Sequence, residues 1–224
     1  MKKDVVKSEN YEECYVAFID LLGFKNIVKT LECKEIYSIF EEIKDESLIQ
    51  PIRFCGGDSN YNLPLDKVQK YVMSDSVIFY INIREEYSLA ALIKQVSYSA
   101  QKLLRQNLPI LMRGGISKGA LFIRERIIYG PALNEAYELQ EDVSVYPRIV
   151  LANTIDITKE LPDMYKESVY NDFDDNICVE YIAKMTRDMK AKCIEQIDAH
   201  CSEKEKNQKI QAKRNYVKRL LEKN

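Results

Sequence analysis

Two aspartates early in the chain stand where carboxylates could do chemistry. Asp20 follows residues 15–19, an apolar run rich in β-branched and aromatic side chains that predicts a strand buried on both faces. Asp75 lies at the tip of a hairpin predicted over 68–83. Two carboxylates on adjacent strand ends can hold a pair of Mg²⁺ or Mn²⁺ ions, which clamp a triphosphate and activate a hydroxyl for in-line displacement. The pattern therefore predicts palm-like phosphoryl transfer.

The residues after Asp20 bear on the same chemistry. Leu21, Leu22 and Gly23 lead into a helical pattern, so the N–H groups that open the helix lie beside the carboxylate, where metal-bound phosphate could sit. A structural alternative stays open, in which Asp20 caps that helix and Asp75 only forms the turn. Taken with the glycine pattern further along the chain, the two aspartates favour the chemical interpretation.

Composition limits the class of protein. The chain has 224 residues, 46% of them hydrophobic and 30% charged, which is enough for one core with an appended segment. The net charge of -2 gives no basic footprint for general nucleic-acid binding. No apolar run approaches the ~20 residues that span a bilayer, and the first residues, MKKDVVKSENYEE, lack the apolar core of a signal peptide. We therefore expect a cytoplasmic protein without a nucleic-acid or membrane partner.

Cysteine and histidine offer little chemistry. The six cysteines have no CxxC spacing, and His200 is the single histidine. This pattern argues against a zinc site and against a histidine-based catalytic dyad or triad. Any chemistry must use carboxylates, a metal, or Arg, Lys and Tyr.

The remaining periodicity predicts an α+β fold, a mixed or antiparallel sheet with helices packed on it. The expected helices are 24–31, 34–48, 87–108, 132–141 and 154–160, and the further strands are 109–123, interrupted or bulged at its glycines, 126–129, 148–152 and 177–182. The glycines and prolines of residues 51–66 predict a strand end and a long turn or loop. Residues 186–223 predict a surface helix or helix pair for packing or dimerisation. The expected organisation is an arm at 1–12, a main domain at 13–184 and a C-terminal helical extension at 185–224.

Four segments resemble one known family, in that family's order, across residues 14–141. FIDLLGF looks like the opening strand of class III nucleotidyl cyclase catalytic domains, and MSDSVIF like their metal-binding hairpin. MRGGISKGAL looks like their glycine-bearing strand, and YGPALNEAYEL like their strand-to-helix segment. The resemblance implies a ferredoxin-like, palm-type fold and leaves the C-terminal part of the chain unaccounted for.

The resemblance also implies roles for single residues. Asp20 and Asp75 would bind two Mg²⁺ or Mn²⁺ ions per site, with the Leu21 carbonyl assisting. Arg113 would contact the triphosphate, and Asn134 would orient the ribose and stabilise the transition state. The backbone amides that would cradle phosphate are those of Leu22, Gly23 and Phe24. Sites in the family are shared across a head-to-tail dimer, so a homodimer is implied.

Two departures from purine cyclases concern the base. The position of their base-reading Lys is Tyr71, and that of its partner Asp is Ile127. This looks like the pattern of bacterial cytidylate and uridylate cyclases of Pycsar-type antiphage defence, whose cyclic product acts through a separate effector. A tyrosine can read a pyrimidine edge because its hydroxyl donates or accepts while its ring packs on the base. CTP and UTP are not distinguished by this pattern.

Two alternatives stay open. The family's transition-state Arg aligns with Glu138, which cannot stabilise an anion, so either Lys118, Arg124 or Arg126 substitutes or the domain is catalytically inactive and serves as a nucleotide-binding scaffold. Residues 56–59, GGDS, resemble the hairpin of GGDEF and CRISPR-type palms, which would make the protein a cyclic-dinucleotide synthase.

Overall fold

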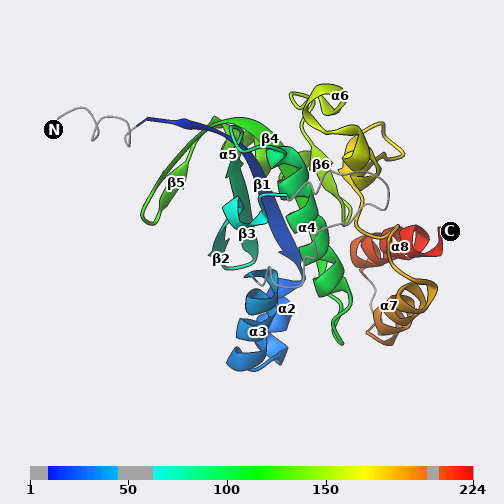
Figure 1. Ribbon diagram of the computed structural model, residues 1–224. Helices are drawn as coiled ribbons and strands as arrows, with labels where there is room; N and C mark the ends of the chain where they lie inside the picture. Colours follow the sequence, from blue (N-terminus) through cyan, green and yellow to red (C-terminus); the bar gives the residue numbers. More distant parts are fainter. Residues whose placement is uncertain (1–9, 45–62, 201–206, 224) are drawn as a thin grey trace.

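The computed structural model describes residues 10–44, 63–200 and 207–223. Across these residues the strands form one sheet of eight, in the order β2-β3-β1-β4-β6-β8-β7, with β5 paired to the far end of β4 (Figure 1). Neighbouring strands are antiparallel except for β4 and β6, which are parallel. The predicted α+β class with a mainly antiparallel sheet is confirmed.

The centre of the sheet is β1 (Glu12–Leu22), which lies between β3 (Ser76–Asn82) and β4 (Leu111–Arg124). Residues 14–19 of β1 are all buried, which confirms the strand predicted to be covered on both faces. The strand extends further than the apolar run, because Asp20 still pairs with β3 and β4. This extension places Asp20 within the hydrogen-bonded part of the sheet, close to its end.

The hairpin predicted over 68–83 is confirmed as β2 (Gln69–Met73) and β3, joined at Ser74 and Asp75. Ser74 has a φ of 56°, the left-handed conformation that tight hairpin turns require. The short strand β5 (Ile127–Tyr129) folds back on β4, and the two project from the body of the sheet (Figure 1).

The expected interruption of the strand at its glycines is wrong, because β4 runs unbroken through them. The glycines serve close packing instead. A Cβ at Gly114 would lie 2.6 Å from the carbonyl oxygen of Phe18, and one at Gly115 would lie 2.4 Å from that of Ala136. Both distances are shorter than any Cβ contact a folded protein tolerates, so these positions let the neighbouring strand and a helix approach the sheet.

Helices cover the two faces of the sheet unequally. The larger core holds alternate β1 residues from Tyr15 to Leu21 and the buried residues of most helices. These helices are α2 (Phe24–Thr30), α3 (Cys33–Lys44), α4 (Ser88–Leu104), α7 (Arg187–Ala199) and α8 (Gln208–Glu222). The opposite face of β1 packs on α5 (Pro131–Glu138), which continues into a π-helical turn, Leu139–Val143.

The rest of the sheet is built from short elements. Its strands are β6 (Ile149–Leu151), β7 (Val169–Asn171) and β8 (Ile177–Val179). The remaining helical elements are α6 (Ile157–Glu160) and the 3₁₀ turns Leu65–Lys67 and Asp163–Ser168. The sequence did not predict β7. Residues 56–59, GGDS, which the sequence predicts as part of a loop with a palm-like hairpin as the alternative, lie outside the described residues. Along the described segments of the chain, no helix has the length and apolar character needed to cross a membrane.

Candidate functional site

The backbones of Asp20 and Asp75 are neighbours at one end of the central strands. The register pairs Asp20 with Ser76, the residue after Asp75. The Leu21 amide donates to the Asp75 carbonyl oxygen at 2.8 Å and fixes the hairpin turn against β1. The sequence-based expectation that the two aspartates lie on adjacent strand ends is therefore met by the register. The Asp75 side chain is exposed, whereas the Asp20 side chain is only 19% exposed.

Arg113 lies directly opposite Asp20 in the register of β1 and β4. Its Nε donates to Asp20 Oδ2 at 2.8 Å, and its side chain is 17% exposed. Nη1 donates to the main-chain oxygen of Gln140 at 3.4 Å, and Nη2 lies 3.6 Å from Glu141 Oε2. With its amide oxygen turned toward the guanidinium, Gln140 also accepts from Nε and Nη2, at 2.9 and 2.7 Å. The π-helical turn thus holds Arg113 together with Asp20.

The donor set at this end of β1 fits a hard divalent cation. Mg²⁺ and Mn²⁺ prefer carboxylate and carbonyl oxygens, which Asp20, Asp75 and the Leu21 main chain supply. Asp20 can ligate through Oδ1 while Oδ2 accepts from Arg113. Among the described residues no group of three or more His, Cys, Asp or Glu could hold a metal. Phosphate oxygens of a substrate would therefore have to complete the coordination, as in many Mg²⁺ sites.

The chain turns sharply just after this site. Gly23 has a φ of 81° and begins α2, and its carbonyl oxygen accepts from the amides of Asn26 and Ile27 at 2.8 and 3.2 Å. A Cβ at Gly23 would meet nothing within 4 Å, so the left-handed backbone, not space, favours glycine here. The predicted phosphate cradle, the amides of Leu22 to Phe24, lies in this turn and stays a prediction.

Tyr71 and Ile127, the predicted base-reading positions, lie in neighbouring elements. The Tyr71 hydroxyl donates to the main-chain oxygen of Arg126 at 3.1 Å, which ties β2 to the start of β5. The Ile127 side chain is exposed by 60%. Asn134 lies in the first turn of α5. Its main-chain N–H donates to the Gly130 main-chain oxygen at 3.1 Å, and the residue is exposed to solvent. The contributions of these three residues to binding remain predictions.

Lys118, one of the cations considered as a substitute for the missing arginine, is committed elsewhere. Its Nζ donates to Glu160 Oε2 at 2.8 Å, and Glu160 also accepts from the Tyr15 hydroxyl. Burial acts to raise the pKa of Glu160, but these two hydrogen bonds lower it overall. Lys118 thus belongs to a structural ion pair between β4 and α6.

The sequence did not predict that Lys213 of α8 is coupled electrostatically to the residues around Asp20. Lys213 of α8 is partly buried, and its charge interacts with those of Arg113, Asp20 and Glu141. Burial lowers the pKa of Lys213, and the neighbouring Arg113 lowers it further. The sequence carried no signal for this placement, because the apolar stripe of 186–223 predicts only that the helices pack.

No family model matches the chain, and no curated protein matches it. Several solved structures are similar in chain arrangement. The adenylyl cyclase CyaB from P. aeruginosa has a TM-score of 0.48 and 16% identity, over 79% of this chain and 98% of that one. The catalytic core of a rhodopsin-guanylyl cyclase with converted specificity has a TM-score of 0.48 and 14% identity, over 65% and 79%. An adenylate/guanylate cyclase/hydrolase from Silicibacter pomeroyi has a TM-score of 0.47 and 14% identity, over 75% and 95%.

Proposed function

We propose that this protein is a metal-dependent nucleotidyl cyclase that converts CTP or UTP to a 3',5'-cyclic mononucleotide and pyrophosphate. The observation that carries the proposal is the placement of Asp20 and Asp75 on neighbouring backbones at one end of the sheet, with Arg113 bonded to Asp20. Two carboxylates and a guanidinium at one sheet end suit a substrate that arrives as a metal complex of a triphosphate. The four motif resemblances, in family order, agree with this choice.

The reaction is an intramolecular displacement. The 3'-hydroxyl oxygen attacks the α-phosphorus, the bond from that phosphorus to the oxygen bridging to the β-phosphate breaks, and pyrophosphate leaves with the negative charge while the hydroxyl proton passes to water. Bound divalent ions would supply charge neutralisation and acidify the hydroxyl. Asp20 and Asp75 would hold those ions, and Arg113 would orient the triphosphate, because a guanidinium binds phosphate oxygens through two parallel hydrogen bonds.

The base is assigned to Tyr71 and Ile127. A Tyr hydroxyl serves the donor and acceptor edges of cytosine and uracil alike, and an exposed Ile side chain offers an apolar contact without a polar group for a purine edge. The hydrogen bond from Tyr71 to the Arg126 main chain holds both positions in one region. The proposed assembly is a homodimer in which Asn134 of one subunit completes the site of the other. A signal in antiphage defence, read by a separate effector, is the role that the resemblance suggests.

The test is incubation of the purified chain with each of ATP, GTP, CTP and UTP plus Mn²⁺, with products identified by mass spectrometry. A cyclic CMP or UMP product that disappears in Asp75→Ala supports the proposal. Asp66→Ala is the matched control, since Asp66 is an exposed carboxylate that pairs with Lys67 on a neighbouring turn. Cyclic dinucleotides would instead support the GGDS interpretation. No product from any nucleotide would favour a catalytically inactive scaffold.

A further inference from the structure

Arg113 spends most of its hydrogen-bond donors within the chain. A guanidinium donates through Nε, Nη1 and Nη2, and each Nη carries a pair of N–H groups. Nε donates to Asp20 Oδ2 at 2.8 Å, and Nη1 donates to the Gln140 main-chain oxygen at 3.4 Å. Nη2 donates to the Gln140 side chain at 2.7 Å and lies 3.6 Å from Glu141 Oε2. Within the part of the chain that the structure describes, these contacts leave one N–H of Nη1 without a partner.

A phosphate group bound by Arg113 needs more than this one donor. Guanidinium and phosphate typically meet through two parallel hydrogen bonds, and Nη1 can share such a pair with Nη2 only if Nη2 gives up a present contact. Gln140 is 2% exposed, and breaking its bond would leave a buried amide oxygen unpaired. The Glu141 carboxylate is 55% exposed and stands beyond hydrogen-bond distance. Glu141 is therefore the contact that an entering phosphate group replaces.

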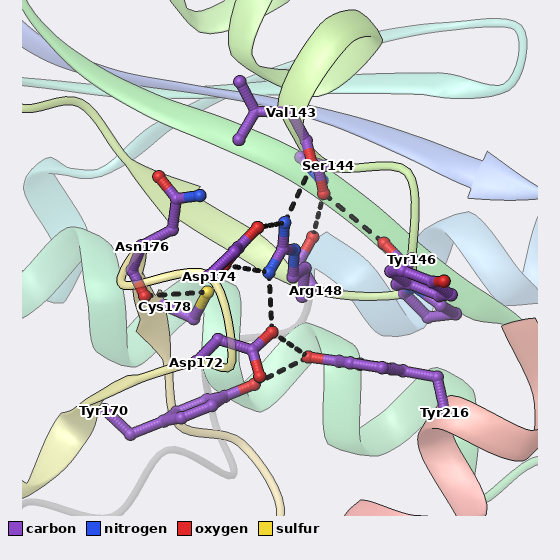
Figure 2. Close-up of polar contacts among 12 residues, drawn as sticks. Val143, Ser144, Tyr146, Arg148, Tyr170, Asp172, Asp174, Asn176, Cys178 and Tyr216 are labelled. Carbon is purple, nitrogen blue, oxygen red and sulfur yellow. Dashed lines mark hydrogen bonds and ion pairs between the residues drawn. The ribbon is translucent and has the colours of Figure 1, made fainter.

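The π-helical turn that carries Glu141 is anchored by a buried arginine. Arg148 has a side chain that is 2% exposed, and its Nη2 donates to the Val143 carbonyl oxygen at 3.0 Å, at the end of the turn (Figure 2). The Arg148 carbonyl oxygen accepts at 3.0 Å from the amide of Gly114, the residue after Arg113. Arg148 thus ties the turn to the strand that carries Arg113. Glu141 can leave the guanidinium by rotation of its own side chain, without movement of the turn.

We propose that Glu141 sets the affinity of this site for polyphosphate, because its carboxylate occupies the edge of Arg113 that a phosphate group binds. The inference rests on the proposed function, in which Arg113 orients the triphosphate, and deepens it by naming the residue that the substrate displaces. Glu141 lowers the affinity in two ways, since it competes for the donors of the guanidinium and its negative charge repels the ligand. The ligand class is an inorganic or nucleoside polyphosphate.

Glu141→Gln tests the inference through the binding of inorganic tripolyphosphate, with Mg²⁺, to the full chain by titration calorimetry. A neutral amide competes for a guanidinium far less than a carboxylate does, so the affinity is expected to rise about three- to fivefold, the upper part of what an exposed ion pair provides. Asp142→Asn is the matched control, because it removes the same charge from the next exposed position of the turn. Its affinity is expected to stay within about twofold of the native one, since a charge in water acts weakly at a distance. Equal midpoints of urea unfolding would show that neither change acts through the fold.

The outcomes separate this inference from the proposed function. An affinity of Glu141→Gln no higher than the native one, an equal gain in Asp142→Asn, or no binding by any of the three proteins overturns the role of Glu141. If the native chain makes a cyclic nucleotide and Glu141→Gln leaves its KM unchanged, the role of Glu141 is again overturned while the cyclase proposal stands. If Glu141→Gln tightens tripolyphosphate binding but no nucleotide is turned over, the cyclase proposal fails and the polyphosphate site at Arg113 stands.

Discussion

At the scale of single residues, the bond of Asp20 to Arg113 and its proposed binding of a metal ion need not compete. Its bond to Arg113 keeps a partly buried carboxylate and a partly buried guanidinium compensated before substrate arrives. Leaving either one without the other inside the sheet margin would cost more free energy than the pair itself provides. The pair therefore preorganises the site, and metal-bound triphosphate would take over the charges of both partners.

Asp20→Asn tests this arrangement. The amide keeps the shape of the side chain but removes the charge, so Mn²⁺ affinity is expected to fall at least about tenfold and cyclic product to fall with it. Mn²⁺ binding followed by electron paramagnetic resonance, in the presence of nucleotide, reports the affinity directly. Asp66→Asn is the control of equal chemistry. Unchanged Mn²⁺ binding in Asp20→Asn would remove this residue from the metal site.

Tyr71→Phe tests the base-reading assignment. The change removes one hydroxyl and its hydrogen bond to the Arg126 main chain while keeping the ring. The ratio of kcat/KM for the preferred pyrimidine to kcat/KM for ATP is expected to drop about tenfold, because a polar edge of the base loses its partner. Stability should change little, since Tyr71 is only half-buried. A constant ratio with a lower overall rate would assign Tyr71 a structural role.

At the scale of elements, the sequence predicted those whose periodicity is strong. The central strand follows from a nearly continuous apolar run, the hairpin at Asp75 from two strand-like segments around a turn, and the long helix α4 from apolar residues at helical spacing. The three-residue strand β7 and the π-helical turn have no such period, so they were missed or merged into neighbours. The meeting of Asp20 with Asp75 could be predicted because both end paired strands. The Arg113 to Asp20 bond depends on strand register, which the spacing of apolar residues does not determine.

Arg148→Met tests whether a buried polar network docks α8 on the sheet. In this network Arg148 donates to Asp172 and Asp174, and Tyr216 of α8 donates to Asp172. The change leaves the Asp172 carboxylate, which is 6% exposed, without its cation and removes the partner of the more exposed Asp174, so the free energy of unfolding is expected to fall by about 3 to 5 kcal/mol. Urea unfolding followed by circular dichroism measures the loss. Arg187→Met, at an exposed position in α7, should unfold as the native chain does. An unchanged midpoint for Arg148→Met would mean that the apolar contacts of α8 suffice to dock it.

The hydrogen bonds from Arg148 to Asp174 also predict that the free energy of unfolding decreases at acid pH. Hydrogen bonds from Arg148 lower the pKa of Asp174 from its ordinary value of 3.8 to about 2. The folded state therefore holds this carboxylate charged where the unfolded chain would bind a proton, so its contribution is complete above pH ~4 and is lost as the pH falls toward ~2. Because Asp174 is partly exposed, the expected loss is about 1 kcal/mol. Asp174→Asn should flatten this part of the stability curve, and a native curve without slope there would contradict the assignment.

At the scale of the whole molecule, β5 and the end of β4 project from the sheet (Figure 1), and β5 carries exposed apolar side chains. Ile127 and Tyr129 of β5 are exposed, and Tyr129 stacks on Phe122 with centroids 4.8 Å apart. Tyr11 meets Tyr129 edge to face at 5.9 Å. On α5, exposed Tyr137 packs on Phe18. Exposed apolar and aromatic groups of this kind are typical of protein interfaces, which supports the proposed homodimer.

A shared site makes a prediction that no monomeric enzyme can satisfy. If Asp75 of one subunit acts with Asn134 of the other, Asp75→Asn and Asn134→Ala dimers each lack both sites, whereas a mixed dimer has one intact site formed by its two native halves. Co-expression of the two variants is expected to restore about a quarter of native activity, since half of the dimers are mixed and each has one of its two sites. The measurement is cyclic nucleotide formed per chain, with sedimentation establishing the dimer. Activity no greater than the sum of the separate variants would place Asp75 and Asn134 in the same subunit's site or remove one of them from catalysis.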